Sequence, residues 1–168
     1  MSFTIGNGAC CFTGHRDFEE TATDRQKLLF QKLVNNLIGC GYTTFIAGGA
    51  IGFDTFAAEY ILKKRAEGAP IRLELVIPCA DQDSRWGFFM KRRYRKILKA
   101  ADSLECLHER YVDGCMQERN RRMVDKSAVC VAFCRKQSGG TFYTVKYARS
   151  HGVDIYDLFA MDQAIDRL

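Results

Sequence analysis

Apolar residues along the chain follow two alternating patterns. Short runs of the kind found in buried strands predict strands at 9–13, 43–47, 71–77, 103–107, 128–134 and 153–156. Between most of these runs, apolar residues recur at the spacing of amphipathic helices. Alternation of strands and helices is typical of βαβ units, whose strands lie parallel. We therefore predict an α/β fold, a Rossmann-like open and mostly parallel sheet with helices on both faces.

Capping residues and glycines mark the ends of the predicted helices. Thr23 and Gln26 form a predicted capping box, and the apolar stripe that follows ends before Gly39. A second helix begins near Phe53 and stops before Gly68. Further helices are predicted from about position 86, over 116–127 and over 141–150. Since no internal repeat and no flexible linker divides the chain, residues 1–168 are predicted to form a single domain.

The composition is typical of a protein that folds without a partner. Its 168 residues are 47% hydrophobic and include only two prolines, so a core of ordinary size can offset the loss of backbone entropy. Residues 1–7 have no basic flank followed by an apolar run, and no apolar run approaches the length of a membrane helix. We therefore expect a cytoplasmic protein that makes no contact with a membrane.

The eight cysteines contain no C-x-x-C pair, and most lie in apolar, strand-like segments. Such a distribution indicates reduced thiols in the core rather than disulfides or a zinc site. We accordingly expect no metal site.

The net charge of +5 is unevenly distributed. Basic residues concentrate in two segments, with Arg85, Lys91, Arg92, Arg93, Arg95, Lys96 and Lys99 in the first and Arg119, Arg121, Arg122 and Lys126 in the second. They favour an anionic partner, unless they are only solvated helix faces. In the first segment Phe88, Phe89 and Tyr94 are interleaved with the cations, as in a platform that stacks nucleic-acid bases. Phe88 and Phe89 fit the inward face of a helix equally well, so single-stranded DNA is a minor alternative.

Glycine and small polar residues gather in the loops that follow the predicted strands. Such loops meet at one edge of a parallel sheet, where open α/β folds bind their ligands. The glycine turns at 48–52 and 138–141 each precede a helix and leave backbone amides open to phosphate. The candidate ligand-binding residues at this edge are Thr13, Gly14, His15, Arg16, Gly48, Gly49, Gly52, Asp54, Gln82, Trp86, Ser138, Gly139, Gly140 and Thr141.

Helical spacing over 116–127 brings two polar residues onto an inward face. The stripe consists of Met116, Arg119, Asn120, Met123, Val124 and Ser127. Its apolar members indicate that it faces the core. Arg119 then needs an anionic partner, because an unpaired buried charge costs several kcal/mol. A ligand phosphate and a structural carboxylate are both compatible with this spacing.

Three further side chains have two interpretations each. His15 and His108 follow predicted strands, as catalytic residues do, although a loop histidine is usually only solvated. Trp86 stands at the start of the third predicted helix, where it either stacks on a base or packs against the protein.

The motifs also resemble a known family. In order they are Cys11-Phe12-Thr13-Gly14-His15-Arg16, Gly48-Gly49-Ala50-Ile51-Gly52-Phe53-Asp54, Ile77-Pro78-Cys79 with Gln82 and Trp86, the segment 116–125, and Gly139-Gly140-Thr141. This order is similar to that of the YpsA-like branch of the SLOG superfamily, which is named after the Smf/DprA and LOG proteins. The resemblance covers about residues 9–157 and implies a Rossmann-like fold that binds nucleotides or nucleotide-derived signals.

The resemblance also bears on catalysis. LOG proteins are phosphoribohydrolases that use an arginine in a Met-x-x-Arg-Lys stretch and a glutamate after a Gly-Gly-x-Gly-Thr loop. By resemblance Arg119 matches that arginine, with Asn120 in place of the lysine, whereas Thr144 stands where the glutamate is expected. Cleavage between base and sugar passes through an oxocarbenium-like state that a carboxylate stabilises. The missing glutamate therefore favours binding over LOG-type catalysis.

The leading hypothesis is a domain that binds or senses a nucleotide-like ligand such as AMP, ADP-ribose or an NAD-related molecule. Its phosphates would lie on the 48–52 and 138–141 loops, with Arg119 as counter-charge and the 13–16 loop closing over the sugar or base. The alternatives are an enzyme that hydrolyses an N-glycosidic or phosphate bond of a nucleotide, with Arg119 as candidate catalytic residue, and DprA-like binding of single-stranded DNA. A homodimer is compatible with the sequence, which names neither the ligand nor the pathway.

Overall fold

The computed structural model describes residues 8–166 and contains one open sheet of six parallel strands. Its strands are β1 (Ala9–Gly14), β2 (Thr44–Ala47), β3 (Arg72–Ile77), β4 (Ser103–Cys106), β5 (Val129–Phe133) and β6 (Asp154–Asp157). They lie in the order β4-β3-β2-β1-β5-β6, so the direction of winding reverses between β1 and β5. In register, Cys11 of β1 lies between Ile46 of β2 and Cys130 of β5. The predicted fold class is confirmed.

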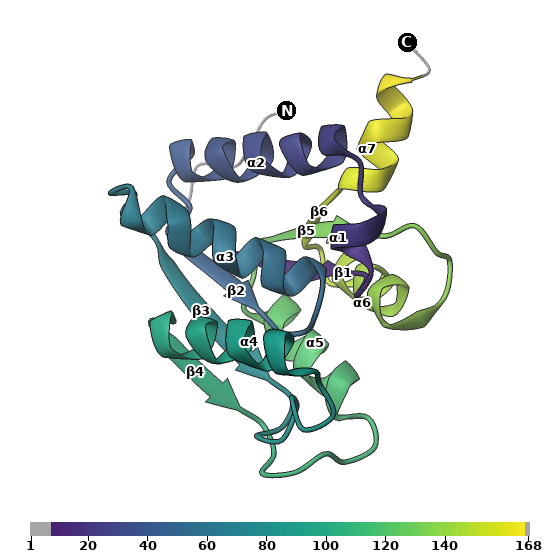
Figure 1. The fold of residues 1–168 in the computed structure, drawn as a ribbon. Helices are drawn as coiled ribbons and strands as arrows, with labels where there is room; N and C mark the ends of the chain where they lie inside the picture. The colour runs from purple at the N-terminus through teal and green to yellow at the C-terminus, as the bar shows by residue number, and fades with distance from the viewer. Residues whose placement is uncertain (1–7, 167–168) are drawn as a thin grey trace.

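Helices cover both faces of the sheet (Figure 1). The helices are α1 (Phe18–Thr21), α2 (Asp24–Gly39), α3 (Phe53–Ala66), α4 (Phe88–Ala100), α5 (Cys115–Asp125), α6 (Gly139–Ser150) and α7 (Leu158–Ile165). One core cluster joins the sheet to α1, α2, α3, α4 and α7, and a smaller one joins the opposite face to α5 and α6. Strand β1 serves both clusters by alternation, because Cys10 and Phe12 face the first while Cys11 faces the second.

Aromatic rings fill the larger cluster near the carboxyl end of β1. Phe18, fully buried, makes edge-on contacts with Phe53 and Phe133, with ring centroids 4.9 and 4.8 Å apart. Phe12 lies between Phe30 and Phe53 at 5.7 and 6.3 Å. Each pair of this kind contributes about 1 kcal/mol beyond the burial of its surface. The rings thus form a rigid support under the loop that follows β1.

The helix predictions are confirmed at most positions and incomplete at two. Thr23 and Gln26 form the expected reciprocal cap, with both hydrogen bonds 3.1 Å long. Helices α1 and α7 were not predicted, since α1 is a single turn and α7 follows directly on a strand. Asp157 begins α7 by accepting a hydrogen bond from the amide of Phe159 at 3.1 Å.

The alternative that placed Phe88 and Phe89 on the inward face of a helix is wrong. Their exposed fractions are 73% and 78%, because α4 turns its other side, with Tyr94 and Ile97, toward the core. The six cations of α4 are interleaved with its apolar residues, so its helical periodicity gave two candidate faces.

Most cysteines lie in the core, as expected. Cys10, Cys11, Cys79, Cys115 and Cys130 are buried free thiols, whereas Cys106 is exposed. Burial raises the pKa of Cys10 well above its ordinary value, which keeps that thiol protonated and unreactive. Within residues 8–166 there is neither a metal-binding cluster of His, Cys, Asp or Glu nor a helix long and apolar enough to span a membrane.

Two glycines allow the loop after β1 to lie directly against the start of α3. A Cβ atom on Gly14 would lie 2.5 Å from Cβ of Phe53, and one on Gly52 would collide with the backbone of Arg16. Gly52 also has φ of +88°, a conformation that other residues rarely adopt. The amide of Phe53 donates to the carbonyl of His15 at 3.2 Å and joins the two segments. The position of the 13–16 loop therefore depends on these glycines.

Replacing Gly52 by alanine should destabilise the protein by about 2 kcal/mol or more, because the methyl group meets backbone rather than a movable side chain. Urea denaturation measures the change. Gly39→Ala is the matched control, since its Cβ would meet nothing within 4 Å and its φ is ordinary; it should leave stability unchanged or slightly higher. Equal stability of the two variants would show that the loop does not need this close approach.

Candidate functional site

A cavity of about 250 Å³ opens at the carboxyl end of β1, beside the point where the strand order reverses. Open α/β sheets bind their ligands at such points. Four segments form its wall: the 12–16 segment of β1 and its loop, the β2–α3 connection, the start of α5 and the start of α6. The lining residues are Phe12, Thr13, Gly14, His15, Arg16, Ala50, Asp54, Met116, Arg119, Asn120, Gly140 and Thr141.

The start of α6 offers open backbone amides to the cavity. Ser138 precedes the helix but makes no side-chain hydrogen bond to its first turn, and Gly139 has φ of +85°. A Cβ atom on Gly140 would meet nothing within 4 Å. The free amides and the dipole of a helix start favour an anion, so this wall of the cavity is electropositive.

In another part of the lining, Asp54 and Arg119 both form hydrogen bonds to Gly48. Oδ2 of Asp54 accepts hydrogen bonds from the amides of Gly48 and Ala50 at 3.0 and 3.4 Å. Nη1 of Arg119 donates to the carbonyl oxygen of Gly48, and its Nε donates to the side-chain oxygen of Asn120 at 2.7 Å. A side chain on Gly48 would collide with Arg119 and come within 2.7 Å of Asp54. The buried pair thereby fixes the loop after β2.

Both charged groups also present polar atoms to the cavity. Asp54 and Arg119 are each 6% exposed, and neither Oδ1 of Asp54 nor Nη2 of Arg119 has a hydrogen-bond partner among the described residues. The same holds for the hydroxyls of Thr13 and Thr141, at 6% and 8% exposure. In the described chain, only Gln82 Oε1 and Arg135 Nε are fully enclosed side-chain polar atoms without a partner. The four groups are therefore reachable from the cavity.

Burial and mutual attraction act in opposite directions on the two charges. Burial raises the pKa of Asp54 and lowers that of Arg119, while each charge partly offsets the effect on the other. Arg16, exposed at the rim, lowers both pKa values. A ligand anion on Arg119 would replace part of the lost solvation.

His15 connects the first loop to the loop that precedes α6. Its Nε2 accepts a hydrogen bond from the amide of Arg135 at 3.0 Å, so the neutral ring carries its proton on Nδ1. Arg135 also forms an ion pair with Asp17 at 2.7 Å. Burial and the charge of Arg135 lower the pKa of His15, with a further contribution from Lys136, against the opposing effect of Asp17. His15 is thus held neutral at the edge of the cavity.

The cavity includes only part of the predicted site. It brings together nine predicted residues: Thr13, Gly14, His15, Arg16, Asp54, Arg119, Asn120, Gly140 and Thr141. Phe12, Ala50 and Met116 also line it but were not predicted as site residues. Met116 belongs to the same inward stripe as Arg119, and that signal could have identified it.

The remaining predicted residues lie outside the lining. A Cβ atom on Gly49, which has φ of +67°, would lie 2.9 Å from Tyr94. Gln82 donates to the carbonyl of Gly49 at 3.3 Å and to Tyr94 at 3.2 Å, and Trp86 packs edge-on against Tyr94. Gln82, Tyr94 and Trp86 therefore pack against the 48–52 loop outside the cavity lining. Gly48, Gly52, Ser138 and Gly139 belong to the two glycine turns but do not line the cavity. His108 pairs with Glu118 at 2.7 Å, away from the cavity lining.

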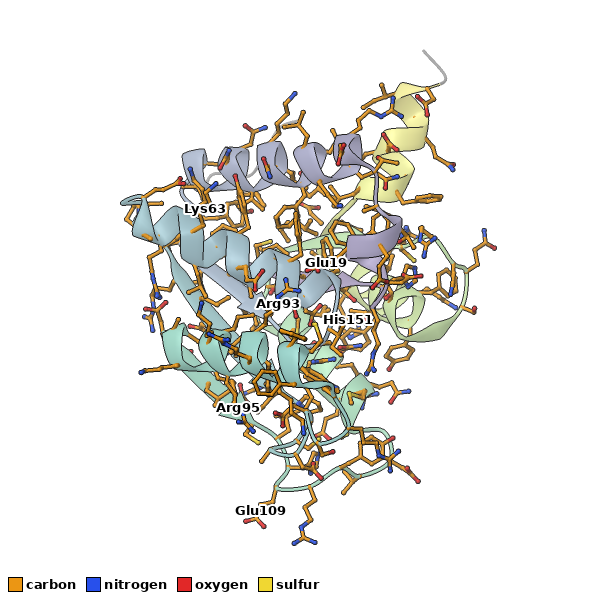
Figure 2. All side chains as sticks on the ribbon, viewed as in Figure 1. Glu19, Lys63, Arg93, Arg95, Glu109 and His151 are labelled. Carbon is orange, nitrogen blue, oxygen red and sulfur yellow. The ribbon has the colours of Figure 1, made fainter. Side chains whose placement is uncertain are left out.

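A second hollow follows the exposed side of α4. It is a shallow groove of about 350 Å³ lined by Phe88, Lys91, Arg92, Arg95, Lys96 and Lys99, which we call the α4 basic stripe. Arg93 lies on the other side of the helix, paired with Glu19 at 2.6 Å and Glu59 at 2.8 Å (Figure 2). Within the described residues, Arg92, Lys96 and Lys99 have no such partner.

The groove is open to solvent and carries mostly positive charge, unlike the cavity at β1, whose wall also contains the carboxylate of Asp54.

Comparison with known proteins relates the chain to one family. A family model described as the YspA SLOG family matches residues 10–163. A UPF0398 protein of Halalkalibacterium halodurans is 29% identical over 126 residues, which cover 73% of this chain and 67% of that protein. The SPbeta prophage-derived protein YoqJ of Bacillus subtilis is 33% identical over 119 residues, covering 62% of this chain and 68% of the relative.

Two solved structures are similar in fold. DNA processing protein A from Helicobacter pylori aligns with a TM-score of 0.63 at 19% identity, covering 89% of this chain and 64% of that one. DNA processing protein A from Streptococcus pneumoniae aligns with a TM-score of 0.64 at 18% identity, covering 89% of this chain and 49% of that one. The chain therefore spans about two thirds and one half of these structures, and the likeness concerns the fold.

The contact between His15 and Arg135 predicts a pH dependence of stability. A histidine whose folded pKa is lowered contributes stability that is present above its unfolded pKa and lost as pH falls through the folded pKa. Protonation removes the acceptor for the Arg135 amide and places a charge beside Arg135. Melting temperature should therefore fall more between about pH 7 and about pH 5 in the natural protein than in His15→Gln, whose side-chain oxygen can still accept. Parallel curves would show that His15 does not titrate against this contact.

Proposed function

Because the chain belongs to the YspA SLOG family, which confirms the resemblance drawn from its motifs, we propose that the cavity at β1 binds a nucleotide or a nucleotide-derived ligand. AMP, ADP-ribose and NAD-related molecules are the candidate ligands, and binding would serve to sense them. The observation that carries the proposal is a wall of buried polar groups, on Thr13, Asp54, Arg119 and Thr141, whose free atoms are reachable from the cavity. Buried polar groups are normally paired, so such a wall favours a polar ligand.

Two features of this wall suit a phosphate group. The start of α6 supplies open amides at Gly140 and Thr141, and Arg119 supplies N–H groups on Nη2. A guanidinium makes charge-assisted hydrogen bonds to phosphate oxygens that are stronger than neutral ones. Arg119 forms no ion pair with a carboxylate in the described chain, where its hydrogen bonds go to Gly48 and Asn120. Asp54 therefore offsets the charge of Arg119 only in part, and Nη2 remains available to a ligand.

Hydrolysis of a nucleotide is a weaker proposal. Thr144, which stands where LOG proteins have a glutamate, donates its hydroxyl to the carbonyl of Gly140 at 2.8 Å and does not line the cavity. It therefore brings no carboxylate to a reacting sugar in the cavity. Incubation of the protein with AMP, ADP-ribose and NAD, followed by chromatography for released base or ribose, separates turnover from binding.

The hydroxyl of Thr141 provides a sharp test of the cavity. Thr141→Val keeps the shape of the side chain but removes a hydroxyl that has no partner in the described protein. AMP affinity, measured by titration calorimetry, should fall about tenfold, the effect of losing a hydrogen bond of about 1.4 kcal/mol. Melting temperature should change little.

Thr144→Val is the matched control on the same helix, because Thr144 is also buried and lies outside the cavity lining. It should leave AMP affinity unchanged. The proposal fails if both variants bind AMP as the natural protein does, or if AMP does not bind to the natural protein.

Single-stranded DNA is a second candidate, and it concerns the α4 basic stripe. The sequence favoured this partner less because Phe88 and Phe89 also suited a core-facing position, but both rings are exposed beside the cations. Aromatic rings next to cations are what non-specific binding of single strands uses. The H. pylori protein of similar fold was described for its single-stranded DNA binding mode, which adds support at the level of fold.

Replacing both Phe88 and Phe89 by alanine should weaken binding of a labelled thymidine oligonucleotide at least about tenfold, since stacking contributes about 1–3 kcal/mol per base. Fluorescence anisotropy at constant salt measures the affinity. Leu28→Ala removes an exposed apolar side chain from α2 and should have no effect. Unchanged affinity in the double variant would exclude the stripe as a stacking surface.

A further inference from the structure

The free oxygen of Asp54 limits what can lie beside it in the cavity. Oδ2 is occupied by the amides of Gly48 and Ala50, whereas Oδ1 has no partner among the described residues and is reachable from the cavity. An ionised carboxylate accepts hydrogen bonds on both of its oxygens. A ligand group that meets Oδ1 must therefore donate a hydrogen bond.

Charge separates the two ends of a bound ligand. A phosphate is repelled by the carboxylate of Asp54 and attracted by the start of α6 and by Arg119. The group near Asp54 must then be an uncharged donor on the same ligand. In a nucleotide, the ribose hydroxyls and the donors of the base meet this requirement.

The size of the cavity favours the sugar. Its volume of about 250 Å³ lies below the roughly 300–1,000 Å³ of pockets that enclose drug-sized ligands. It therefore accommodates part of a nucleotide. With the phosphate at one wall, the adjoining ribose is the part that falls within the same small space, and the base extends toward the rim.

Resting on the proposed function, we infer that the cavity recognises a ribose phosphate, with Oδ1 of Asp54 accepting a hydrogen bond from the ribose 2-hydroxyl. The site then prefers ribonucleotides to deoxyribonucleotides. Asp54 has two roles in this arrangement: Oδ2 fixes the loop after β2, and Oδ1 selects the sugar.

Competition against AMP tests this preference in the natural protein. Ribose 5-phosphate should displace AMP, and 2-deoxyribose 5-phosphate should do so at least about tenfold less well, because a hydrogen bond to a charged group is lost. AMP should likewise bind at least about tenfold more tightly than its 2-deoxy form. If AMP binds but the two sugar phosphates compete equally, or neither competes, the inference is overturned while the proposed function stands. If AMP does not bind, both fail.

The variant Asp54→Asn tests whether Asp54 is the group that prefers ribose to deoxyribose. Its side-chain oxygen can still accept from Gly48 and Ala50, while its NH2 group meets the ligand with donors in place of an acceptor. The ratio of affinities for ribose and deoxyribose phosphates should fall to about one. Asp157→Asn is the matched control, since Asp157 also accepts from backbone amides, at Cys134 and Phe159, but lies outside the cavity lining.

The control should keep the ratio of the natural protein. An unchanged ratio in a folded Asp54→Asn protein, verified by its melting temperature, would assign the preference to another group and overturn the role of Asp54. If that variant does not fold, the competition between the two sugar phosphates in the natural protein still decides the inference.

Discussion

The shape of the cavity depends on the hydrogen bonds that Asp54 and Arg119 form with Gly48. Both side chains are buried, and both form hydrogen bonds to the backbone of the same residue. The carboxylate accepts from the amide of Gly48, and the guanidinium donates to the carbonyl oxygen of Gly48. Buried charges are costly unless they are paired and hydrogen-bonded. The hydrogen bonds to Gly48 satisfy Oδ2 of Asp54 and Nη1 of Arg119, and they join the loop after β2 to α5. The remaining polar atoms of both side chains face the cavity, which lies where the strand order reverses.

The sheet could be predicted because buried parallel strands leave a simple signal. Apolar runs such as 129–133 alternate with amphipathic segments, and this pattern requires little tertiary information. The inward position of Arg119 followed from the same periodicity, since it shares a stripe with Met123 and Val124. Helix α1 left no such signal, because a four-residue turn is stabilised by Phe18 inserting among distant rings.

The candidate site could be predicted only in outline. The candidates at the strand ends included seven of the lining residues, and the helical stripe over 116–127 added Arg119 and Asn120. Glycine content alone, however, did not separate open amides from close packing. Gly140 has empty space beside it, whereas Gly48 and Gly52 have none because Arg119 and the backbone of Arg16 lie against them. Contacts between segments far apart in the sequence decide such differences. The same reason applies to Phe88 and Phe89, whose exposure depends on how α4 is rotated against the sheet.

The most direct test of the central claim, that the β1 cavity is a nucleotide site, is an amide-resolved nuclear magnetic resonance titration of the protein with AMP. We predict saturable shifts at residues 13–16, at Gly140 and Thr141, and at the first turn of α5, with little change along α4. Shifts confined to the opposite edge of the sheet, near Tyr42 and Gly152, or no saturable shifts at all, would contradict it.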